Sequence, residues 1–390
     1  MRLYIHVPFC SKKCAYCAFY SLPLEEGAPG EKRIAGYAAS LLREVSLRGE
    51  HLGRIPVKTV FFGGGTPSLL SGTIIGDIMR MIRACFLLTD NAEISAEANP
   101  DSALNDGWLF AARAAGVNRL SFGVQSFDDA VLRLLGRPHG ARAAHAAFES
   151  ARMAGFTNIS IDLMWGLPGP PPYAQTQVQW LRQLKLATEL KPEHIAAYGF
   201  TLEPASPLEK MYAGGGLSLP KEKELASMYL AGAEYLESRG YMQYEISNYA
   251  RMGFMCRHNL AYWEGEEYLG LGPAAVSTIG DKRWTNAADL GEWQKAVTDG
   301  IPASSAEDLN EEAKAREMLM LRLRMNKGLP LKDWRQRIGR SAASACEPLI
   351  AVLQKNGLAA VRSGHLRLTR PGMLVSDTIL SHFFARLEEG

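Results

Sequence analysis

The sequence has few cysteines, little net charge and no long apolar segment. Its 390 residues include six cysteines, too few and too scattered for a fold stapled by disulfides. The formal net charge of +2 creates no strong field that would attract nucleic acid or an anionic membrane surface. No run of about 18 apolar residues occurs, and the N-terminus lacks the pattern of a signal peptide. We therefore expect a protein of the reducing cytoplasm that neither spans a membrane nor binds nucleic acid.

Three of the six cysteines stand together near the N-terminus. Cys10, Cys14 and Cys17 follow a short alternating strand at residues 3–7, with the spacing C-x3-C-x2-C. Three thiolates at one strand end can hold three corners of an iron–sulfur cube and leave the fourth iron open to a ligand. A structural zinc site is one alternative, although such sites take four ligands and His6 is the only further candidate nearby. Buried cysteines without a metal are the other.

The chain from residue 31 to about residue 250 alternates between amphipathic helices and short strands. Glycine follows several of the predicted helices, as expected of a residue that ends a helix in the left-handed conformation. This alternation predicts an α/β fold, a parallel sheet shaped as a partial TIM-like barrel of six β/α units. The further strands are expected at residues 57–62, 92–98, 117–124, 157–164, 194–200 and 244–247, and the helices at residues 31–50, 71–88, 102–115, 141–154, 173–190 and 220–239.

Polar residues occur at or near the ends of three of these strands. Glu97, Gln125 and Asp162 each stand in an otherwise apolar or small-residue segment. A polar side chain inside a barrel is costly unless it finds a partner, and ligands in such folds collect at the carboxyl ends of the strands. The three residues therefore indicate a binding site, with structural hydrogen bonding as the alternative for any one of them. The glycines at residues 63–65 allow close backbone approach to a ligand, or simply form a turn.

A second unusual segment reads C-R-H-N-L-A-Y-W at residues 256–263. Histidine is a common axial ligand of haem iron, and flat aromatic side chains can line a porphyrin. Cys256 is another candidate ligand of such an iron. Taken by themselves, these residues favour a loop packed on the barrel through Tyr262 and Trp263, because aromatic clusters are usually packing.

The last part of the chain predicts a small α+β lobe. Three helices and a hairpin with strands at residues 358–361 and 366–369 suggest a winged-helix-like fold. Its charge is mixed rather than arranged as a basic stripe, so we expect a lid or a partner-docking lobe and no nucleic-acid binding. We expect three parts: the barrel at residues 1–250, the segment with the C-R-H-N-L-A-Y-W motif and a linker at residues 251–309, and the lobe at residues 310–390.

The cysteine loop resembles the signature of the radical S-adenosylmethionine (SAM) superfamily. The sequences I-H-V-P-F-C and C-A-Y-C-A-F around these cysteines are similar to those of one branch of the superfamily, the oxygen-independent coproporphyrinogen III oxidases and HemW-type haem chaperones. The resemblance implies a (β/α)6 barrel and a 4Fe–4S cluster whose unique iron chelates SAM. Arg137 could pair with the SAM carboxylate in bidentate fashion, with a surface ion pair as the alternative. The implied SAM contacts are Tyr4, Tyr16, Gly64, Gly65, Thr66, Glu97, Gln125, Arg137 and Asp162.

The resemblance leaves two functions from different classes. One is a haem chaperone that delivers haem to acceptor proteins such as respiratory cytochromes. The other is a radical SAM enzyme acting on a porphyrinogen or haem, such as the oxidase or a methyltransferase. The oxidases carry a further cysteine where this chain has Phe19, and they lack the segment H-N-x-x-Y-W. That segment stands here as His258, Asn259, Tyr262 and Trp263.

Both features favour the chaperone. They imply haem as a third cofactor, with His258 in its site, and no coproporphyrinogen III oxidase activity. We assign no residue a catalytic role. The expected partners are haem and haem-accepting proteins, and a homodimer and peripheral membrane association through the acceptors are compatible with the sequence.

Overall fold

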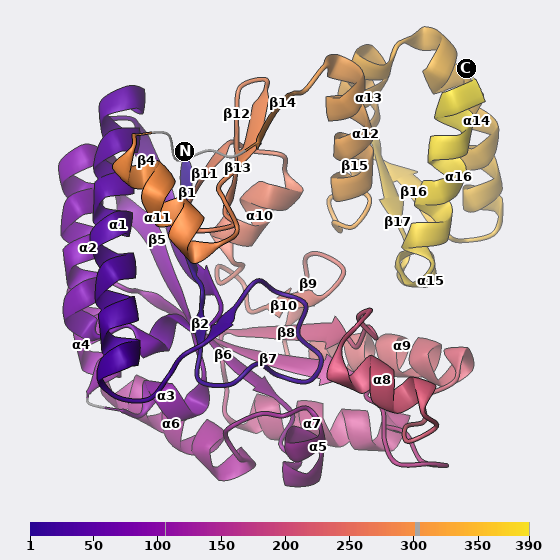
Figure 1. Cartoon of the computed structure of the whole chain (residues 1–390). Helices are drawn as coiled ribbons and strands as arrows, with labels where there is room; N and C mark the ends of the chain where they lie inside the picture. Colours follow the sequence, from indigo (N-terminus) through magenta and orange to yellow (C-terminus); the bar gives the residue numbers. More distant parts are fainter. Residues whose placement is uncertain (106, 301–304, 390) are drawn as a thin grey trace.

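The molecule is built around one curved sheet with helices on its outer face and a lobe formed by the C-terminal part of the chain (Figure 1). The structure, a computed structural model, describes residues 1–105, 107–300 and 305–389. Within these residues the sheet has twelve strands. In spatial order they are β14 (Ser305–Asp308), β13 (Lys282–Thr285), β12 (Val276–Ile279), β11 (Tyr268–Leu271), β1 (Arg2–Val7), β4 (Pro56–Gly64), β5 (Leu87–Ala98), β6 (Arg119–Gln125), β7 (Ile159–Trp165), β8 (His194–Gly199), β10 (Asn248–Ala250) and β9 (Met242–Gln243).

The central strands, from β11 to β8, are all parallel to one another. The strands β1 and β4 to β8 are the six units predicted for the incomplete barrel, so the expected α/β class is confirmed. The expected parallel strand at residues 244–247 is wrong. Those residues form the turn between β9 and β10, where the Tyr244 N–H donates to the Asn248 carbonyl at 3.1 Å, and β10 runs antiparallel to β8.

The boundary between the second predicted helix and the next strand also differs from the expectation. The helix α2 (Gly72–Cys85) stops before residue 88, and β5 begins at Leu87. Leu87 and Leu88 pair with the first residues of β4. Pairing with a neighbouring strand therefore overrides the helical spacing of apolar residues that continues through Phe86.

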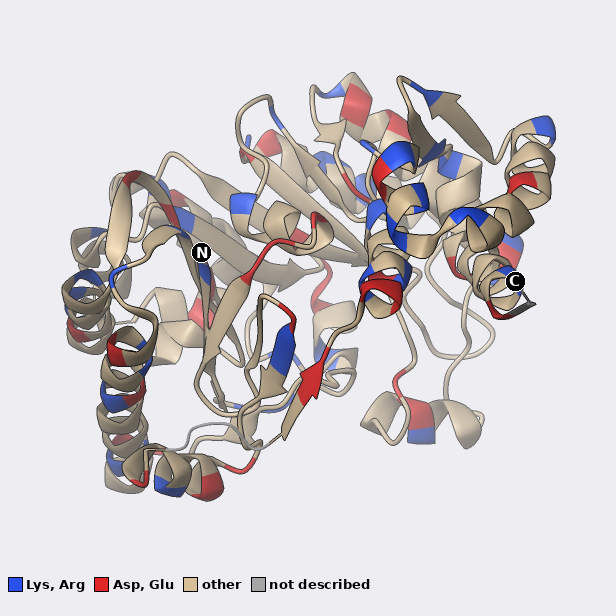
Figure 2. Ribbon diagram, turned by 90° about the horizontal axis from the view of Figure 1, so that it is seen from above, with Lys and Arg blue, Asp and Glu red and all other residues tan. Residues whose placement is uncertain are grey.

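The helices on the outer face are α1 (Ala28–Leu52), α2, α4 (Trp108–Ala115), α6 (Ala141–Met153), α7 (Gln177–Glu189) and α9 (Glu222–Ser238). Figure 2 shows both signs of charge interspersed on the helices. Shorter elements lie in the connections: β2 (Phe9–Cys10), β3 (Leu22–Pro23), the 3-10 turn η1 (Pro67–Leu69), α3 (Pro100–Ala103), α5 (Asp129–Leu134), α8 (Pro207–Ala213), α10 (Arg257–Trp263) and α11 (Leu290–Thr298). Among the described helices, none combines the length and apolar character needed to cross a bilayer.

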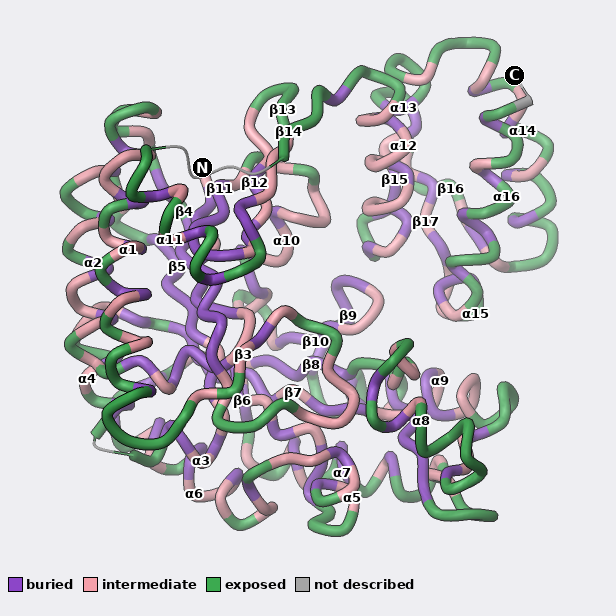
Figure 3. The backbone as a smooth tube through the Cα atoms, in the orientation of Figure 1, coloured by how far each residue is buried: buried purple, intermediate pink, exposed green. Residues whose placement is uncertain are grey.

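The two faces of the barrel sheet differ in chemistry, because successive side chains of a strand point to opposite faces. Residues on the outer face, such as Phe62, Phe122 and Ile161, are buried in the main hydrophobic core (Figure 3). The inner face carries Thr59, Glu93, Ser95, Glu97, Arg119, Ser121, Ser160, Asp162 and His194. Many of these polar groups bond to one another; the Ser121 hydroxyl, for example, donates to the Asp162 carboxylate at 2.9 Å. The barrel interior is thus a hydrogen-bonded polar space.

The C-terminal lobe has its own hydrophobic core and a three-stranded sheet in the order β15-β17-β16. Its hairpin turns at Ser363 and Gly364, both with positive φ, and confirms the two predicted strands. Tyr229 of α9 packs into the core of the lobe and joins it to the barrel. The elements of the lobe are α12 (Glu311–Arg322), β15 (Leu329–Pro330), α13 (Leu331–Ile338), α14 (Arg340–Lys355), β16 (Ala359–Arg362), β17 (His365–Leu368), α15 (Arg370–Leu374) and α16 (Ser376–Glu389).

Candidate functional site

The cysteine loop is shaped at its base by contacts that need no metal. The strand β2 pairs with β3 and closes the loop between them. His6 donates from Nε2 to the Tyr20 carbonyl at 3.0 Å, and its Nδ1 accepts from the Tyr4 hydroxyl at 3.0 Å. Since a carbonyl only accepts, this pair of contacts fixes which ring nitrogen carries the proton. The barrel strand therefore holds the loop through His6.

A cavity of about 520 Å³ opens beside this loop, at the carboxyl ends of the barrel strands. The free thiols Cys10, Cys14 and Cys17 all line the cavity. The structure thus brings residues from distant parts of the sequence to one mouth of the barrel, where such folds bind ligands. Eight of the residues implied as SAM contacts join the cysteines there: Tyr16, Gly64, Gly65, Thr66, Glu97, Gln125, Arg137 and Asp162.

Tyr4 is the implied SAM contact that does not line the cavity. Its ring stacks on Phe61 at a centroid distance of 6.3 Å, and its hydroxyl is bound to His6. In this structure Tyr4 therefore supports the cysteine loop from below.

The glycines at residues 63–65 are required by close packing around the loop. Gly64 has φ of 105°, and a side chain there would meet the His6 ring at 2.5 Å. A Cβ on Gly65 would lie 2.5 Å from the Phe9 carbonyl oxygen. The Gly64 N–H donates to Glu97 at 3.2 Å, so this backbone also orients an acid at the cavity wall.

Two carboxyl groups, Glu97 and Asp162, face the cavity and form no ion pair within the described residues. Burial, and then the charge of Asp162, raise the pKa of Glu97 to about 8. Burial also raises the pKa of Asp162, although it accepts hydrogen bonds from Ser160 and Ser121. A cationic ligand group in the cavity would favour the charged form of both acids. The ammonium and sulfonium groups of SAM have this character.

Gln125 reaches the cavity through a strained backbone. Its φ is 66°, a left-handed value that is uncommon outside glycine, and β6 has an irregular register with β7 between Gly123 and Gln125. A bulge of this kind re-aims a side chain at the end of a strand. The irregularity turns the Gln125 amide into the cavity.

Hydrogen-bond donors point at two of the cysteine sulfurs. The Thr66 hydroxyl donates to Cys10 Sγ at 3.5 Å, and Arg137 donates from Nη1 to Cys14 Sγ at 3.4 Å. Arg137 forms no ion pair within the described residues, so the surface-pair alternative is wrong. Iron-bound thiolates accept hydrogen bonds, and these donors fit a cluster on the three cysteines.

The thiols do not converge as ligands of one ion would. Within the described residues, no three side chains of His, Cys, Asp or Glu come together around a point that could hold a single metal ion. A cube would take each thiolate on a different iron.

His258 lies apart from this cavity, deeper in the barrel. It is 1% exposed and sits at the start of α10, where its Nδ1 is 2.7 Å from the Thr59 hydroxyl and its ring stacks on Phe61 at 5.0 Å. Thr59 precedes Gly63 by four positions on β4, roughly 13 Å at the usual strand rise. The backbone N–H of His258 donates to Glu93 at 3.0 Å, which anchors the helix inside the barrel.

The His258 imidazole is neutral and has one nitrogen without a partner among the described residues, Nε2. Burial, followed by the charges of Arg2 and Arg119, lowers its pKa to about 3. A neutral imidazole with a free nitrogen has the chemistry of a metal ligand. Its burial means that a haem could reach it only after α10 moves.

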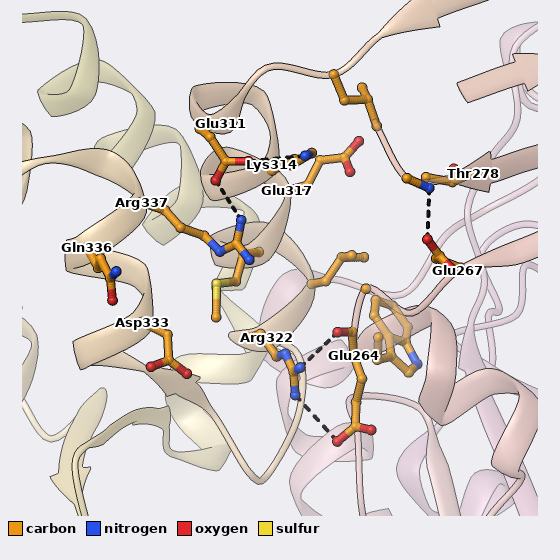
Figure 4. A pocket seen from close by; sticks show the side chains of 16 residues that line it. Glu264, Glu267, Thr278, Glu311, Lys314, Glu317, Arg322, Asp333, Gln336 and Arg337 are labelled. Atoms are coloured by element: carbon orange, nitrogen blue, oxygen red, sulfur yellow. Dashed lines mark hydrogen bonds and ion pairs between the residues drawn. The ribbon is translucent and has the colours of Figure 1, made fainter. Parts of the chain in front are cut away.

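The far end of α10 borders a second cavity, of about 760 Å³, between the barrel and the lobe (Figure 4). Glu264 follows α10 and accepts hydrogen bonds from Arg322 of α12 at its carboxylate and, at 2.8 Å, at its carbonyl. Lys327 binds the same carboxylate at 2.9 Å. Trp263 also lines this cavity. The segment at residues 256–263 is therefore tied to the barrel at one end and to the lobe at the other.

Several residues that line the cysteine cavity were not predicted from the sequence, among them Asn99 and Tyr198. Asn99 lines the wall next to Arg137, and Tyr198 lines it from β8. Tyr198 pairs in register with Met164 of the neighbouring strand, so the rule that ligands collect at strand ends could have identified it. Asn99 precedes Pro100 at the end of β5, and no local pattern distinguishes it from a turn residue.

The cysteine loop, the parallel barrel and the cavity define the class of radical SAM proteins. The sequence profile of the radical SAM superfamily matches residues 4–172, and that of the HemN C-terminal domain matches residues 309–375. A solved structure of the coproporphyrinogen III oxidase HemN from Escherichia coli superposes with a TM-score of 0.80. It is 26% identical, and the match covers 98% of this chain and 89% of HemN.

Curated proteins extend the similarity over nearly the whole chain. A protein of Bacillus subtilis named "Heme chaperone HemW" is 34% identical over 98% of this chain and 99% of its own length. The protein of that name from Escherichia coli is 33% identical over 99% of this chain and 98% of its own. The chain belongs to the HemW family within the radical SAM superfamily. Membership of this superfamily implies a 4Fe–4S cluster and SAM, as expected from the sequence.

Proposed function

We propose that this protein is a haem chaperone that binds haem and delivers it to acceptor proteins such as respiratory cytochromes. The observation that carries the proposal is the full-length similarity to proteins named heme chaperone. Two features of the chain support it. His258 begins the H-N-x-x-Y-W segment, and Phe19 occupies the position where the oxidases carry a further cysteine.

The cysteine cavity is proposed to hold the cluster and SAM. Cys10, Cys14 and Cys17 would ligate three irons, and the acids Glu97 and Asp162 would face the positive groups of SAM. When bound, the cluster and SAM together supply reductive cleavage of a sulfonium carbon–sulfur bond. The chain's own contribution is to orient these groups and to limit water access at the barrel mouth.

The haem site is proposed to form around α10 after this helix moves. His258 Nε2 is unpartnered and suited to iron, but the ring is enclosed by Phe61, Tyr4 and Tyr262. The helix is anchored by Glu93 at its start and by Arg322 and Lys327 at its end. Haem binding would therefore be slow compared with diffusion and sensitive to these anchors.

The similarity to HemN favours one other function, a radical SAM enzyme acting on a porphyrinogen or haem. The residues of the SAM cavity are compatible with it. An enzyme of the oxidase type would decarboxylate coproporphyrinogen III when supplied with SAM and a reductant.

One anaerobic preparation distinguishes the two. The protein is reconstituted with iron and sulfide, titrated with haem, and then incubated with SAM, dithionite and coproporphyrinogen III. A chaperone binds haem in a 1:1 ratio, passes it to an apo-cytochrome and leaves the porphyrinogen unchanged. Robust porphyrinogen turnover without haem transfer would replace the proposal with the oxidase, and release of 5′-deoxyadenosine would show whether SAM is consumed.

A further inference from the structure

A continuous chain of hydrogen bonds joins two of the three cysteines across the cavity, with Asn99 at its centre. Its outer links are the donors to sulfur, Thr66 to Cys10 at 3.5 Å and Arg137 to Cys14 at 3.4 Å. Its inner links run through one amide. Asn99 Nδ2 donates to the Thr66 hydroxyl at 3.3 Å, and Asn99 Oδ1 accepts from Arg137 Nη2 at 2.6 Å.

The direction of every link in this chain is determined. A guanidinium only donates, so the oxygen of the Asn99 amide must face Arg137 and its NH₂ must face Thr66. The Thr66 oxygen then receives a hydrogen bond, which leaves its own proton to point at Cys10. The Asn99 amide thus fixes the Thr66 hydroxyl as a donor to Cys10 and holds the guanidinium that donates to Cys14.

The Asn99 side chain is not needed for the local fold. It stands at the N-cap of α3, where asparagine usually caps the helix, yet its side chain makes no capping bond. The backbone is held independently: its N–H donates to the Ser68 hydroxyl at 3.1 Å, and its carbonyl accepts from the Ala103 N–H at 3.0 Å. The side chain can therefore be changed while the turn is kept.

We propose that Asn99 is a positioning residue that sets the reduction potential of the cluster by fixing the direction of the Thr66–Cys10 hydrogen bond and by holding the Arg137 guanidinium that donates to Cys14. The inference rests on the cluster proposed above. A hydrogen bond to a cluster sulfur stabilises the reduced state, which carries one more electron, and so raises the potential. Loss or reversal of these bonds lowers it.

Two variants of Asn99 distinguish the effect of redirecting the Thr66 hydrogen bond from the effect of removing the Asn99 amide. Asn99→Asp keeps the acceptor for Arg137 but presents a second acceptor to Thr66. The hydroxyl then turns away from Cys10, and the added negative charge acts in the same sense. Asn99→Ala leaves the Thr66 hydroxyl free to keep its bond to sulfur. The expected potentials fall in the order wild type, Asn99→Ala, Asn99→Asp, with the last clearly the most negative.

The measurement is an anaerobic titration of the reconstituted full-length protein without SAM, with the reduced cluster followed by electron paramagnetic resonance. A chemical reductant supplies one electron per cluster. The matched control is Asn118→Asp, because Asn118 also braces β5 through two hydrogen bonds, to Ala92 and Ile94, but has no link to the cysteines. Its potential should equal that of the wild type.

A second variant tests the other link of the chain. Thr66→Val removes the donor to Cys10 and should lower the potential of the cluster. Asn99→Asp should then lower the potential by less in the Thr66→Val protein than it does in the wild type. If Asn99→Asp does not assemble a cluster, a Thr66→Val potential equal to that of the wild type overturns the inference. It is equally overturned if Asn99→Asp matches the wild type or Asn118→Asp. A wild-type protein that takes up no cluster contradicts the proposed function instead.

Discussion

The cysteine cavity and the α10 segment are both rich in unusual residues, but they are built in opposite ways. The cavity is open, its loop is shaped by His6, and its two acids keep raised pKa values although Arg119 acts on both of them. Around His258, at the start of α10, aromatic rings enclose the space, and the acid Glu93 is compensated by backbone N–H groups and by the nearby Arg119. One region is prepared for a ligand in this conformation, and the other must change to receive one.

The difference shows how an unsatisfied group should be interpreted. In the cavity, burial raises the pKa of Glu97 and Asp162, so a positively charged ligand would favour their charged forms. In the α10 segment, aromatic rings enclose the unpartnered nitrogen of His258. A ligand could therefore bind this nitrogen only in a rearranged conformation. The following predictions test this contrast.

The largest effect should come from Cys14→Ala. We expect loss of the iron–sulfur cluster, because two thiolates cannot hold the cube at its normal occupancy. The barrel should stay folded, since the loop is held by backbone and His6 contacts. Iron and sulfide analysis with circular dichroism measures both, and Cys85→Ala, far from the cavity, is the control. Full iron and sulfide content in Cys14→Ala would contradict the site.

Next in size is Glu93→Gln, which removes the charge that anchors α10. Glu93 accepts from the N–H groups of Arg257 and His258, and its charge also acts on the buried Arg119. We expect the free energy of unfolding to fall by about 1–3 kcal/mol, the usual cost of leaving a buried donor without its acceptor. Urea denaturation measures this loss. Haem association, followed by stopped-flow absorbance, should become faster.

The exposed acid Glu50 provides the control, as Glu50→Gln, for both measurements. If haem associates with Glu93→Gln at the wild-type rate despite the lower stability, α10 does not have to move for haem to bind.

A smaller effect is expected from His258→Ala. Haem affinity should fall several-fold, on the order of 1 kcal/mol, because one axial ligand is lost while the porphyrin contacts remain. The haem absorption spectrum should change as well. His382→Ala, on the exposed side of α16, controls for haem bound by surface histidines. Unchanged spectra and affinity in His258→Ala would remove this residue from the haem site.

The smallest effect concerns the pH dependence of stability without SAM. Because the pKa of Glu97 is about 8 in the folded state and 4.5 is its ordinary value, the unfolded chain releases this proton first. The contribution of Glu97 to the free energy of unfolding should therefore be fully present below about pH 4.5, decrease as the pH rises, and level off above about pH 8.

Glu97→Gln should reduce that slope, while Glu44, Glu245 and Asp162, whose pKa values burial also raises, keep part of it. We expect it to raise the free energy of unfolding at pH 8 by on the order of 1 kcal/mol, less than full burial would give because the cavity admits water. The same variant should weaken SAM binding. Glu97→Gln thus stabilises the protein where Glu93→Gln destabilises it. Equal pH profiles for Glu97→Gln and the wild type would show that the acid is not held in its neutral form.

Much of the barrel could be predicted because short stretches of sequence mark its helices and strands. Glycine after the helices and runs of apolar residues mark the alternation of helix and strand, and the cysteine spacing marks the loop. The turn at residues 244–247 was mistaken for a strand because its aromatic and branched residues have high β-propensity, while the antiparallel pairing that defines it lies in β8.

The finer parts of the site depend on contacts that no local pattern records. Asn99 meets Thr66 and Arg137 only when the ends of β4 and β5 and the segment after α5 come together. The burial of His258 depends on Thr59, which is 199 positions away in the sequence. The sequence identified the chemistry of this histidine, but its enclosure follows from the polar inner face of the sheet.

The place of β1 in the sheet has a consequence for biosynthesis. This strand carries the cysteine loop and lies between β4 and β11, with Arg2 paired to Glu266 beside β11. At roughly 5–20 residues per second of translation, β11 leaves the ribosome on the order of 10–40 s after β4. Throughout that interval β1, which carries the cysteine loop, lacks its second neighbouring strand. The three cysteines are therefore synthesised well before the strand that carries them has both of its neighbours in the sheet.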